Sequence, residues 1–243
     1  MQVPTRCGNR RQEVWSALGA VTDPELDESV TALEFITALE IEDQKRVKVE
    51  FRLPTFWCAP NFAFLMASDL RDAVAELPWV EEVSVKLLDH FSADLINRGV
   101  ALRQDFRDAF PGETDDDLTA LRKTFLDKAF EGRQELLLRQ LLAAGYDPGW
   151  ITQVTLGELM RQPLDARGDG LRSLYAFMSR RIRPNAGEED LAFTTVDGKP
   201  LEPSEFRTYL RKVSGVRRNQ EFNGLICRGL LAARNARWGE AAG

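Results

Sequence analysis

The sequence predicts an α+β protein in two domains: a small α-β-β-α-β domain with a mixed sheet over residues 1–100, and a mostly helical domain with one β-hairpin over 101–243. Three observations predict it. Apolar and charged residues alternate over 46–53, which is the period of a half-buried strand. Apolar residues then return at helical spacing over 61–77. Beyond residue 100 the alternation gives way to helical periodicity.

The first domain begins with a helix that should end near Gly19. The segments 35–41 and 46–53 are separated by a polar turn and predict a β-hairpin. A helix over 61–77 then leads to another alternating segment at 83–87. A strand, a helix and a strand in this order predict a right-handed parallel connection. The hairpin and this connection together make the sheet mixed.

The second domain carries weaker signals. Residues Thr114 to Asp117 are typical of a capped helix start, and Asp197-Gly198 is typical of a hairpin turn. Two last helices are expected over 205–213 and 219–234. This tail is rich in arginine, and a basic face could bind nucleic acid or an acidic partner protein. A plain solvated face is the commoner explanation of such a charge run.

The composition limits the class of function. The chain has 243 residues, of which 44% are apolar, enough for a substantial core. A net charge of −6 gives no support for a general nucleic-acid or membrane-surface binder. No apolar run approaches the length of a membrane span, and the first residues lack the apolar segment of a secretory signal. Cys7, Cys58 and Cys227 form an odd, sparse set, which argues for a reducing, cytoplasmic setting.

Cys58 is the cysteine with an informative position. It follows the strand at 46–53 and stands just before Pro60, a residue favoured in the first turn of a helix. The partial positive charge of a helix N-terminus favours a thiolate, which is the nucleophilic and metal-binding form. A small buried core residue is the other interpretation, since free cysteine is often buried. From the sequence, Cys7 and Cys227 have no comparable setting.

Acidic and imidazole groups surround the same predicted sheet edge. Asp89 and His90, the only histidine, follow the strand at 83–87, and the carboxyl ends of parallel strands meet at one edge. Cys58, Asp89 and His90 are a plausible ligand set for iron or zinc, with Asp23 or Glu25 as a further oxygen ligand. The loop of Asp23 and Glu25 could instead be a solvated turn with a cap.

These features resemble the PaaD-like metal–sulfur cluster assembly family over roughly residues 10–97. The resemblance is carried by Asp23-Pro24-Glu25-Leu26 and by the cysteine turn Thr55-Phe56-Trp57-Cys58-Ala59-Pro60. Two departures stand out: Ala59 separates the cysteine from its proline, and a usual Asp-Pro-Pro-Trp-like segment here reads Asp89-His90-Phe91-Ser92. The resemblance implies a maturation factor, not an enzyme, that helps insert iron–sulfur clusters or iron into client proteins. Cys58 would bind a labile cluster or iron, or the site would hold no cofactor.

The whole chain is similar in arrangement to accessory assembly proteins of soluble diiron monooxygenases of the propane- or alkane-oxidising type. Segments 109–113 and 223–234 carry this second resemblance. It implies client oxygenase subunits or other assembly proteins as partners, with no membrane or nucleic acid, and leaves a homo-oligomer open. Two alternatives remain. One is a metal-free adaptor or chaperone that grips the oxygenase through its basic helical half. The other is a thiol-dependent hydrolase using Cys58 and His90, for which no orienting third residue is evident.

Overall fold

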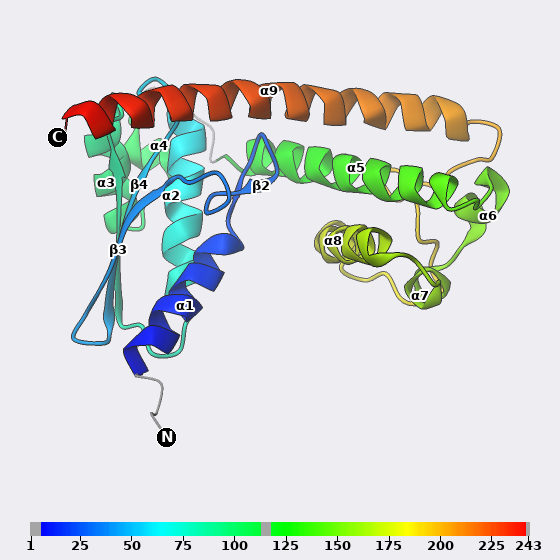
Figure 1. Cartoon of the computed structure of the whole chain (residues 1–243), viewed down its shortest axis with the longest axis horizontal. Coiled ribbons are helices and arrows are strands. Elements are labelled where there is room, and N and C mark those ends of the chain that lie inside the picture. The colour runs from blue at the N-terminus through cyan, green and yellow to red at the C-terminus, as the bar shows by residue number, and fades with distance from the viewer. Residues whose placement is uncertain (1–5, 113–117, 242–243) are drawn as a thin grey trace. The chain divides into compact units, whose positions relative to one another are not determined.

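The computed structural model describes residues 6–112 and 118–241 and confirms the α+β class (Figure 1). It divides into two compact units, one made of 1–121 together with 223–243 and one made of 122–222. The boundary expected after residue 100 differs from this division, because the last segment of the chain groups with the sheet. The expected helix cap at Thr114 to Asp117 lies outside the described residues.

The first unit contains the predicted α-β-β-α-β order with a few short additions. Its strands are β1 (Thr22–Asp23), β2 (Glu28–Ser29), β3 (Ile36–Glu42), β4 (Arg46–Arg52) and β5 (Glu82–Leu88). Its helices are α1 (Arg6–Gly19), α2 (Pro60–Ala75), α3 (Ala93–Ala101) and α4 (Phe106–Ala109), to which the C-terminal part of α9 (Phe206–Ala241) is added.

The sheet has the order β3-β4-β5, with β3 antiparallel and β5 parallel to β4. The predicted mixed sheet is therefore confirmed. Val47, Val49 and Phe51 of β4 are buried, whereas Arg46 and Lys48, which alternate with them, are exposed, as the alternation in the sequence predicts. In the parallel pair the register runs without a break from Arg46 opposite Glu82 to Arg52 opposite Leu88. Consequently β4 and β5 end side by side.

Three residues, 43–45, connect β3 to β4, and the first two are the central residues of a tight turn. Asp43 and Gln44 both have positive φ, 48° and 60°, and the Lys45 amide donates to the Glu42 carbonyl. Positive φ at both central positions defines a type I′ turn, whose twist matches that of a hairpin. The turn therefore fixes the register of β3 on β4.

One hydrophobic core joins these elements. Helix α2 has Pro60 in its first turn and buries seven residues, which pack in the same core as β4 and β5. Helices α2 and α3 both contact β5. Leu231 of α9, only 5% exposed, belongs to this core as well. The two segments that follow β4 and β5 are thereby held on a rigid base.

The second unit is helical, as expected. It comprises most of α5 (Thr119–Ala143), α6 (Pro148–Gln153), α7 (Leu156–Arg161), α8 (Ala166–Ile182) and the N-terminal part of α9. The turn at Asp197-Gly198 is present, with Gly198 at φ +78°, but a single bridge, Thr194 to Pro200, closes it. The expected hairpin is reduced to this turn, since Pro200 has no N–H to extend a ladder.

The prediction of two last helices was wrong, because 206–241 form the single helix α9. The segment has no proline, and Gly215, the glycine between the two expected helices, weakens a helix by only about 1 kcal/mol. Beside that glycine, Arg217 is ion-paired with the buried carboxylate of Glu135 on α5, which holds the helical turn in place. Among the described residues, no helix combines the length and apolarity needed to cross a membrane.

Candidate functional site

Cys58 lies on the loop that joins β4 to α2. It is five residues beyond the buried Leu53, which follows β4, and two residues before Pro60. Its side chain is half-buried and is a free thiol, and its Sγ lies 3.1 Å from Thr55 Oγ1. The carboxyl end of a strand and the amino end of a helix therefore position this sulfur, as the sequence predicts. The side chain is also packed against the hydrophobic core, as the interpretation of a small core residue expects.

His90 lies beside the Cys58 loop but faces its backbone. The ring Nε2–H donates to the Cys58 carbonyl oxygen at 2.7 Å, and Nδ1 accepts the Ser92 N–H at 3.1 Å. The residue is only 7% exposed, and its burial lowers the pKa of the imidazole. A neutral ring with one donating and one accepting nitrogen satisfies both contacts. In this arrangement His90 tethers the loop and neither nitrogen is directed to the thiol.

Asp89, at φ +50°, is engaged by two arginines. Its carboxylate lies 2.7 Å from Arg52 Nε and 3.7 Å from Arg234 Nη2, and its carbonyl accepts from Arg234 Nη2 at 2.7 Å. Arg234 also donates to the Leu53 carbonyl. The Asp89 carboxylate is thus part of an ion-paired link among β4, β5 and α9.

The acidic loop is the capped turn that the sequence left open as one alternative. Asp23 Oδ1 accepts the backbone N–H groups of Glu25 and Leu26 at 2.9 and 3.0 Å. Desolvation raises the pKa of Asp23 to about 6, with the neighbouring acids Glu25 and Glu28 adding to the effect. The Glu25 carboxylate accepts from Asn223 Nδ2 of α9 at 3.0 Å.

The structure brings part of the predicted ligand set together. The loops of Cys58 and His90 meet at one sheet edge, as expected from the parallel strands. Over residues 6–112 and 118–241, however, no three cysteine, histidine, aspartate or glutamate side chains gather in the geometry of one metal ion. The five candidates Cys58, His90, Asp89, Asp23 and Glu25 therefore surround the edge without converging on one point.

Sequence reasoning missed Cys227. This residue of α9 is half-buried against the same core as Cys58, and its thiol interacts electrostatically with Cys58, Asp23 and Glu25. Desolvation raises the pKa of the Cys227 thiol to about 11. The available signal was the helical spacing of Cys227 from Leu231, one turn further on. It could not be used because nothing in the sequence shows where the last helix packs.

Exposed aromatic side chains flank the cysteine. Phe56, Trp57 and Phe91 are 52%, 65% and 58% exposed, and Phe56 packs edge-to-face against both of the others. The Phe91 N–H donates to the Phe56 carbonyl, so the two loops are joined here as well. Clustered, exposed aromatic residues are typical of a surface that contacts another protein.

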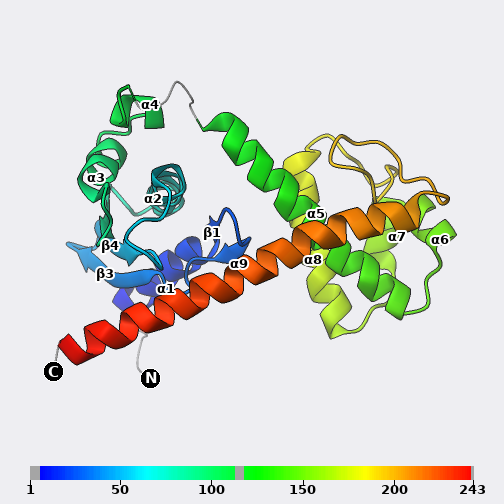
Figure 2. The ribbon, with the colours of Figure 1, turned by 90° about the horizontal axis from the view of Figure 1, so that it is seen from above.

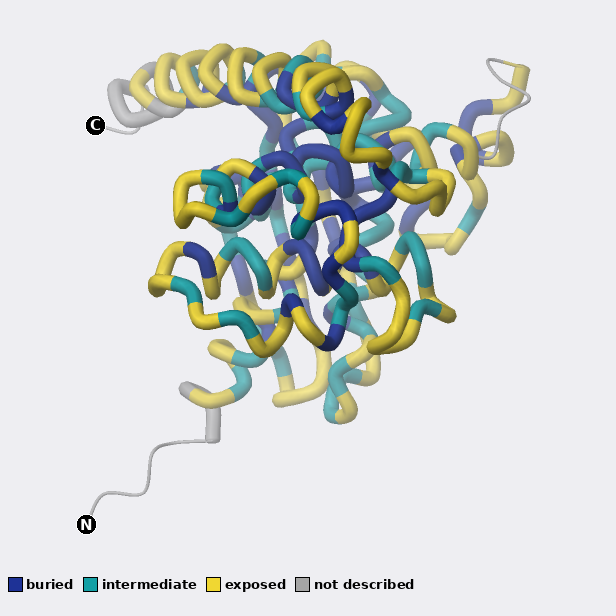
Figure 3. The backbone as a smooth tube through the Cα atoms, turned by 90° about the vertical axis from the view of Figure 1, so that its right-hand side faces the viewer, coloured by how far each residue is buried: buried dark blue, intermediate teal, exposed yellow. Residues whose placement is uncertain are grey.

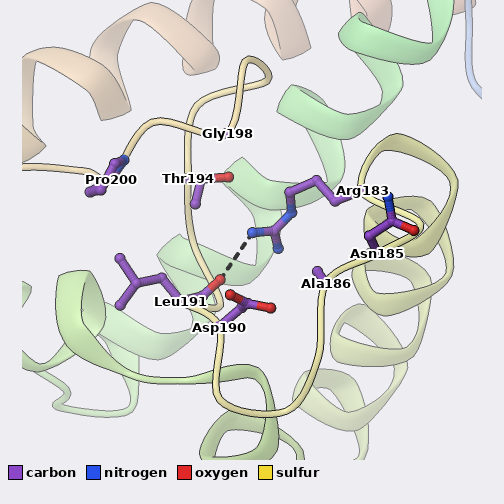
Figure 4. A pocket seen from close by; sticks show the side chains of 8 residues that line it. All are labelled: Arg183, Asn185, Ala186, Asp190, Leu191, Thr194, Gly198 and Pro200. Carbon is purple, nitrogen blue, oxygen red and sulfur yellow. Dashed lines mark hydrogen bonds between the residues drawn. The ribbon is translucent and has the colours of Figure 1, made fainter.

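The second unit has a cavity of about 410 Å³ beside the turn at Gly198 (Figure 4). Arg183 crosses it, but its guanidinium donates to the carbonyls of Leu191 and Ala192 and to Ser179 Oγ. The arginine therefore holds the irregular segment after α8 in place. This cavity gives no specific indication of a ligand.

The arginine-rich tail is largely committed to internal contacts. Arg228 pairs with Glu28, Arg234 with Asp89, and Arg217 with Glu135 and Glu221. Residues 225, 226 and 228–230 of α9 are exposed, and Figure 3 shows the exposed side of this helix. Only part of the expected basic face is therefore left for another molecule.

Residues 11–86 match the family model of iron–sulfur cluster assembly proteins. The match includes the acidic loop, the hairpin, Cys58 and α2, and it ends within β5, before Asp89 and His90. It supports the N-terminal part of the resemblance and a role in cluster assembly or maturation. A search of curated proteins found no match to the chain.

Proposed function

We propose that the protein is an accessory maturation factor that delivers iron or an iron–sulfur cluster to a multicomponent diiron monooxygenase. The observation that carries the proposal is the position of Cys58, a half-buried thiol inside the segment that matches cluster assembly proteins. Thiolates are the ligands that iron–sulfur clusters prefer. The monooxygenase as client rests on the resemblance of the whole chain and is the finer part of the proposal.

The site suits transfer more than storage. A cluster with four sulfur ligands from the protein would be bound too firmly to pass on, whereas Cys58 leaves most ligand positions to exchangeable groups. Asp89 is engaged with Arg52 and Arg234, and His90 with backbone groups, so neither competes for the metal unless these contacts break. The metal or cluster is thus cargo that a client's own ligands can take over.

The exposed aromatic cluster of Phe56, Trp57 and Phe91 is the proposed docking surface for the client. These side chains adjoin Cys58 on the same two loops, so a client bound there would have its metal site next to the thiol. Aromatic residues contribute large contact areas at interfaces, and a few of them supply most of the binding energy.

The test is anaerobic co-purification with the candidate oxygenase, with iron and sulfide measured for wild type, Cys58→Ala and the control Cys7→Ala. We expect Cys58→Ala to lose metal and client activity while its circular dichroism is unchanged, and Cys7→Ala to behave as wild type. Metal content and client activity that are unaffected by Cys58→Ala would refute the proposal.

A metal-free adaptor role is the second candidate. Arg207, Arg211 and Arg218 of α9 are exposed and could contact an acidic partner surface. Charge reversal at Arg211 and Arg218 should then weaken complex formation more than Cys58→Ala does. Arg217 is unsuitable for this test, because its guanidinium is paired with the buried Glu135 carboxylate and its reversal would disturb the fold.

A further inference from the structure

We propose that Cys227 is a second thiol ligand of the Cys58 site, so that iron or an iron–sulfur cluster is held between α9 and the loop after β4. The inference rests on the proposed function and adds a ligand that lies far outside the segment matching cluster assembly proteins, residues 11–86. It is carried by the way α9 is fixed on the first unit.

The register of α9 on this unit is set at both sides of Cys227. Asn223, one turn before the cysteine, donates to the Glu25 carboxylate at 3.0 Å. Leu231, one turn after it, is buried in the core. Arg234, nearly one turn further, donates to the carbonyls of Leu53 and Asp89. These three anchors recur at helical spacing on one face, and Cys227 falls at the same spacing between them, so it faces the same unit.

The anchors lie on the segments that surround Cys58. Glu25 belongs to the acidic loop, while Leu53 and Asp89 stand at the ends of β4 and β5, where the two loops of the site begin. A residue of α9 that lies between these anchors therefore faces the region between the acidic loop and the Cys58 loop. In agreement, the Cys227 thiol interacts electrostatically with Cys58 as well as with the acidic loop. Figures 1 and 2 show the last turns of α9 passing beside this end of the sheet.

The surroundings of the two thiols are partly closed to solvent. Both cysteines are free and half-buried, which shields a metal–sulfur bond from water without closing the site. Arg234 interacts electrostatically with Cys58 and offers positive charge against the anionic sulfur ligands. The Asp23 carboxyl group is also close enough to the Cys227 thiol to interact with it electrostatically.

The chemistry of the step is simple. A divalent metal displaces one proton from each thiol, two metal–sulfur bonds form, and two protons pass to solvent, with no change of oxidation state. Two protein sulfurs fill half of a tetrahedral shell, and small thiols or client cysteines supply the rest. Release to a client then requires the exchange of only two protein ligands.

The test uses the full-length chain, reduced and kept anaerobic, with Co²⁺ as the probe. Sulfur-to-cobalt charge-transfer absorption reports thiolate ligands directly and does not depend on any client. All proteins carry Cys7→Ala, which leaves Cys58 and Cys227 as the two thiols. We compare this background with Cys227→Ala, Cys227→Ser and Cys58→Ala, and Ile226→Ala, an exposed neighbour on α9, is the matched control.

We expect one cobalt per chain in the background and the control. In either Cys227 variant the charge-transfer intensity per cobalt should fall by about half, because one of two sulfurs is gone, and the affinity by about tenfold or more. Two substitutions of different size, each checked by circular dichroism, separate ligand loss from misfolding.

The outcomes distinguish the two proposals. If the Cys227 variants keep the full intensity and affinity while Cys58→Ala loses both, the second ligand is refuted and the proposed function stands. If the background protein shows no sulfur-to-cobalt absorption, thiol ligation fails at both cysteines, and the proposed function loses its metal site with it.

Discussion

Replacing Asp23 with asparagine should stabilise the first unit at high pH and not at low pH. The structure gives the reason. Asp23 Oδ1 accepts two backbone N–H groups in the acidic loop, and an asparagine oxygen can accept the same two. Ionised Asp23 suffers from desolvation and from its acidic neighbours, which raise its pKa from 3.8 to about 6. The amide keeps the cap and removes the charge.

The magnitude follows from linkage. The folded state holds the Asp23 proton more tightly than the unfolded state, so this group's contribution to stability is greatest below pH 3.8 and is lost as the pH rises through 6. Each pKa unit corresponds to about 1.36 kcal/mol, so the full loss is about 3 kcal/mol. Relative to wild type, Asp23→Asn should therefore gain about 2–3 kcal/mol in unfolding free energy between pH 4 and pH 8.

Hydrogen exchange measured by mass spectrometry provides the assay, because it separates the two units. Peptides that cover β4 and β5 are compared between variant and wild type at the same pH, so that intrinsic exchange rates cancel. At pH 8 exchange in the variant should be slower by about two orders of magnitude, and at pH 4 the two proteins should differ much less. Peptides from α5 in the same sample serve as the internal control. A variant that exchanges as fast as wild type at pH 8 would show that Asp23 carries no such penalty.

Three further predictions follow from the contacts of single residues. Burial lowers the pKa of His90, so the contribution of this group to stability is present above pH 6.5 and is lost as the pH falls through the lowered folded-state pKa. A glutamine can make the same two contacts without titrating. His90→Gln should therefore remove this part of the pH dependence of the unfolding free energy, measured by denaturant unfolding at several pH values. Trp57→Ala should change the unfolding free energy by less than about 0.5 kcal/mol, since the side chain is 65% exposed, yet weaken client binding in calorimetry; equal affinity would remove the aromatic surface from the proposal. Glu135→Gln should destabilise the second unit by about 3–5 kcal/mol, because this fully buried carboxylate is ion-paired with Arg139 and Arg217 and accepts a hydrogen bond from Ser214. Hydrogen exchange of α5 peptides that is the same in the variant and the wild type would contradict this prediction.

Local patterns were sufficient to predict the sheet and its neighbours. The alternation in β4, the polar turn at Asp43 and the proline that opens α2 are signals within a few residues of one another, and each has a direct physical cause. The position of Cys58 at a strand end and a helix start followed from the same signals. Parallel pairing then brought His90 to the same edge.

Long-range packing could not be predicted in this way. His90 was expected as a ligand, but its two ring nitrogens are hydrogen-bonded to the backbone of Cys58 and Ser92. The spacing of residues in the sequence does not show which partner a histidine side chain contacts. The Asp89 carboxylate is paired with Arg52, and Asp89 also contacts Arg234, which is 145 residues away along the chain. Cys227 was overlooked for the same reason. The helical character of 205–213 and 219–234 could be recognised, while neither their continuity in α9 nor their contact with the sheet could.

The burial of Leu231 in the core of the first unit has a consequence for synthesis of the protein. The sheet and α2 leave the ribosome well before α9, which supplies residues that complete their core and lies up to 181 residues further along the chain. A nascent chain that ends before Asn223 exposes apolar surface and lacks the anchors to Glu25 and Asp89. Closing contacts of such high sequence separation slows folding and lengthens exposure to aggregation. The first unit can therefore reach its final stability only after this part of α9 has been translated.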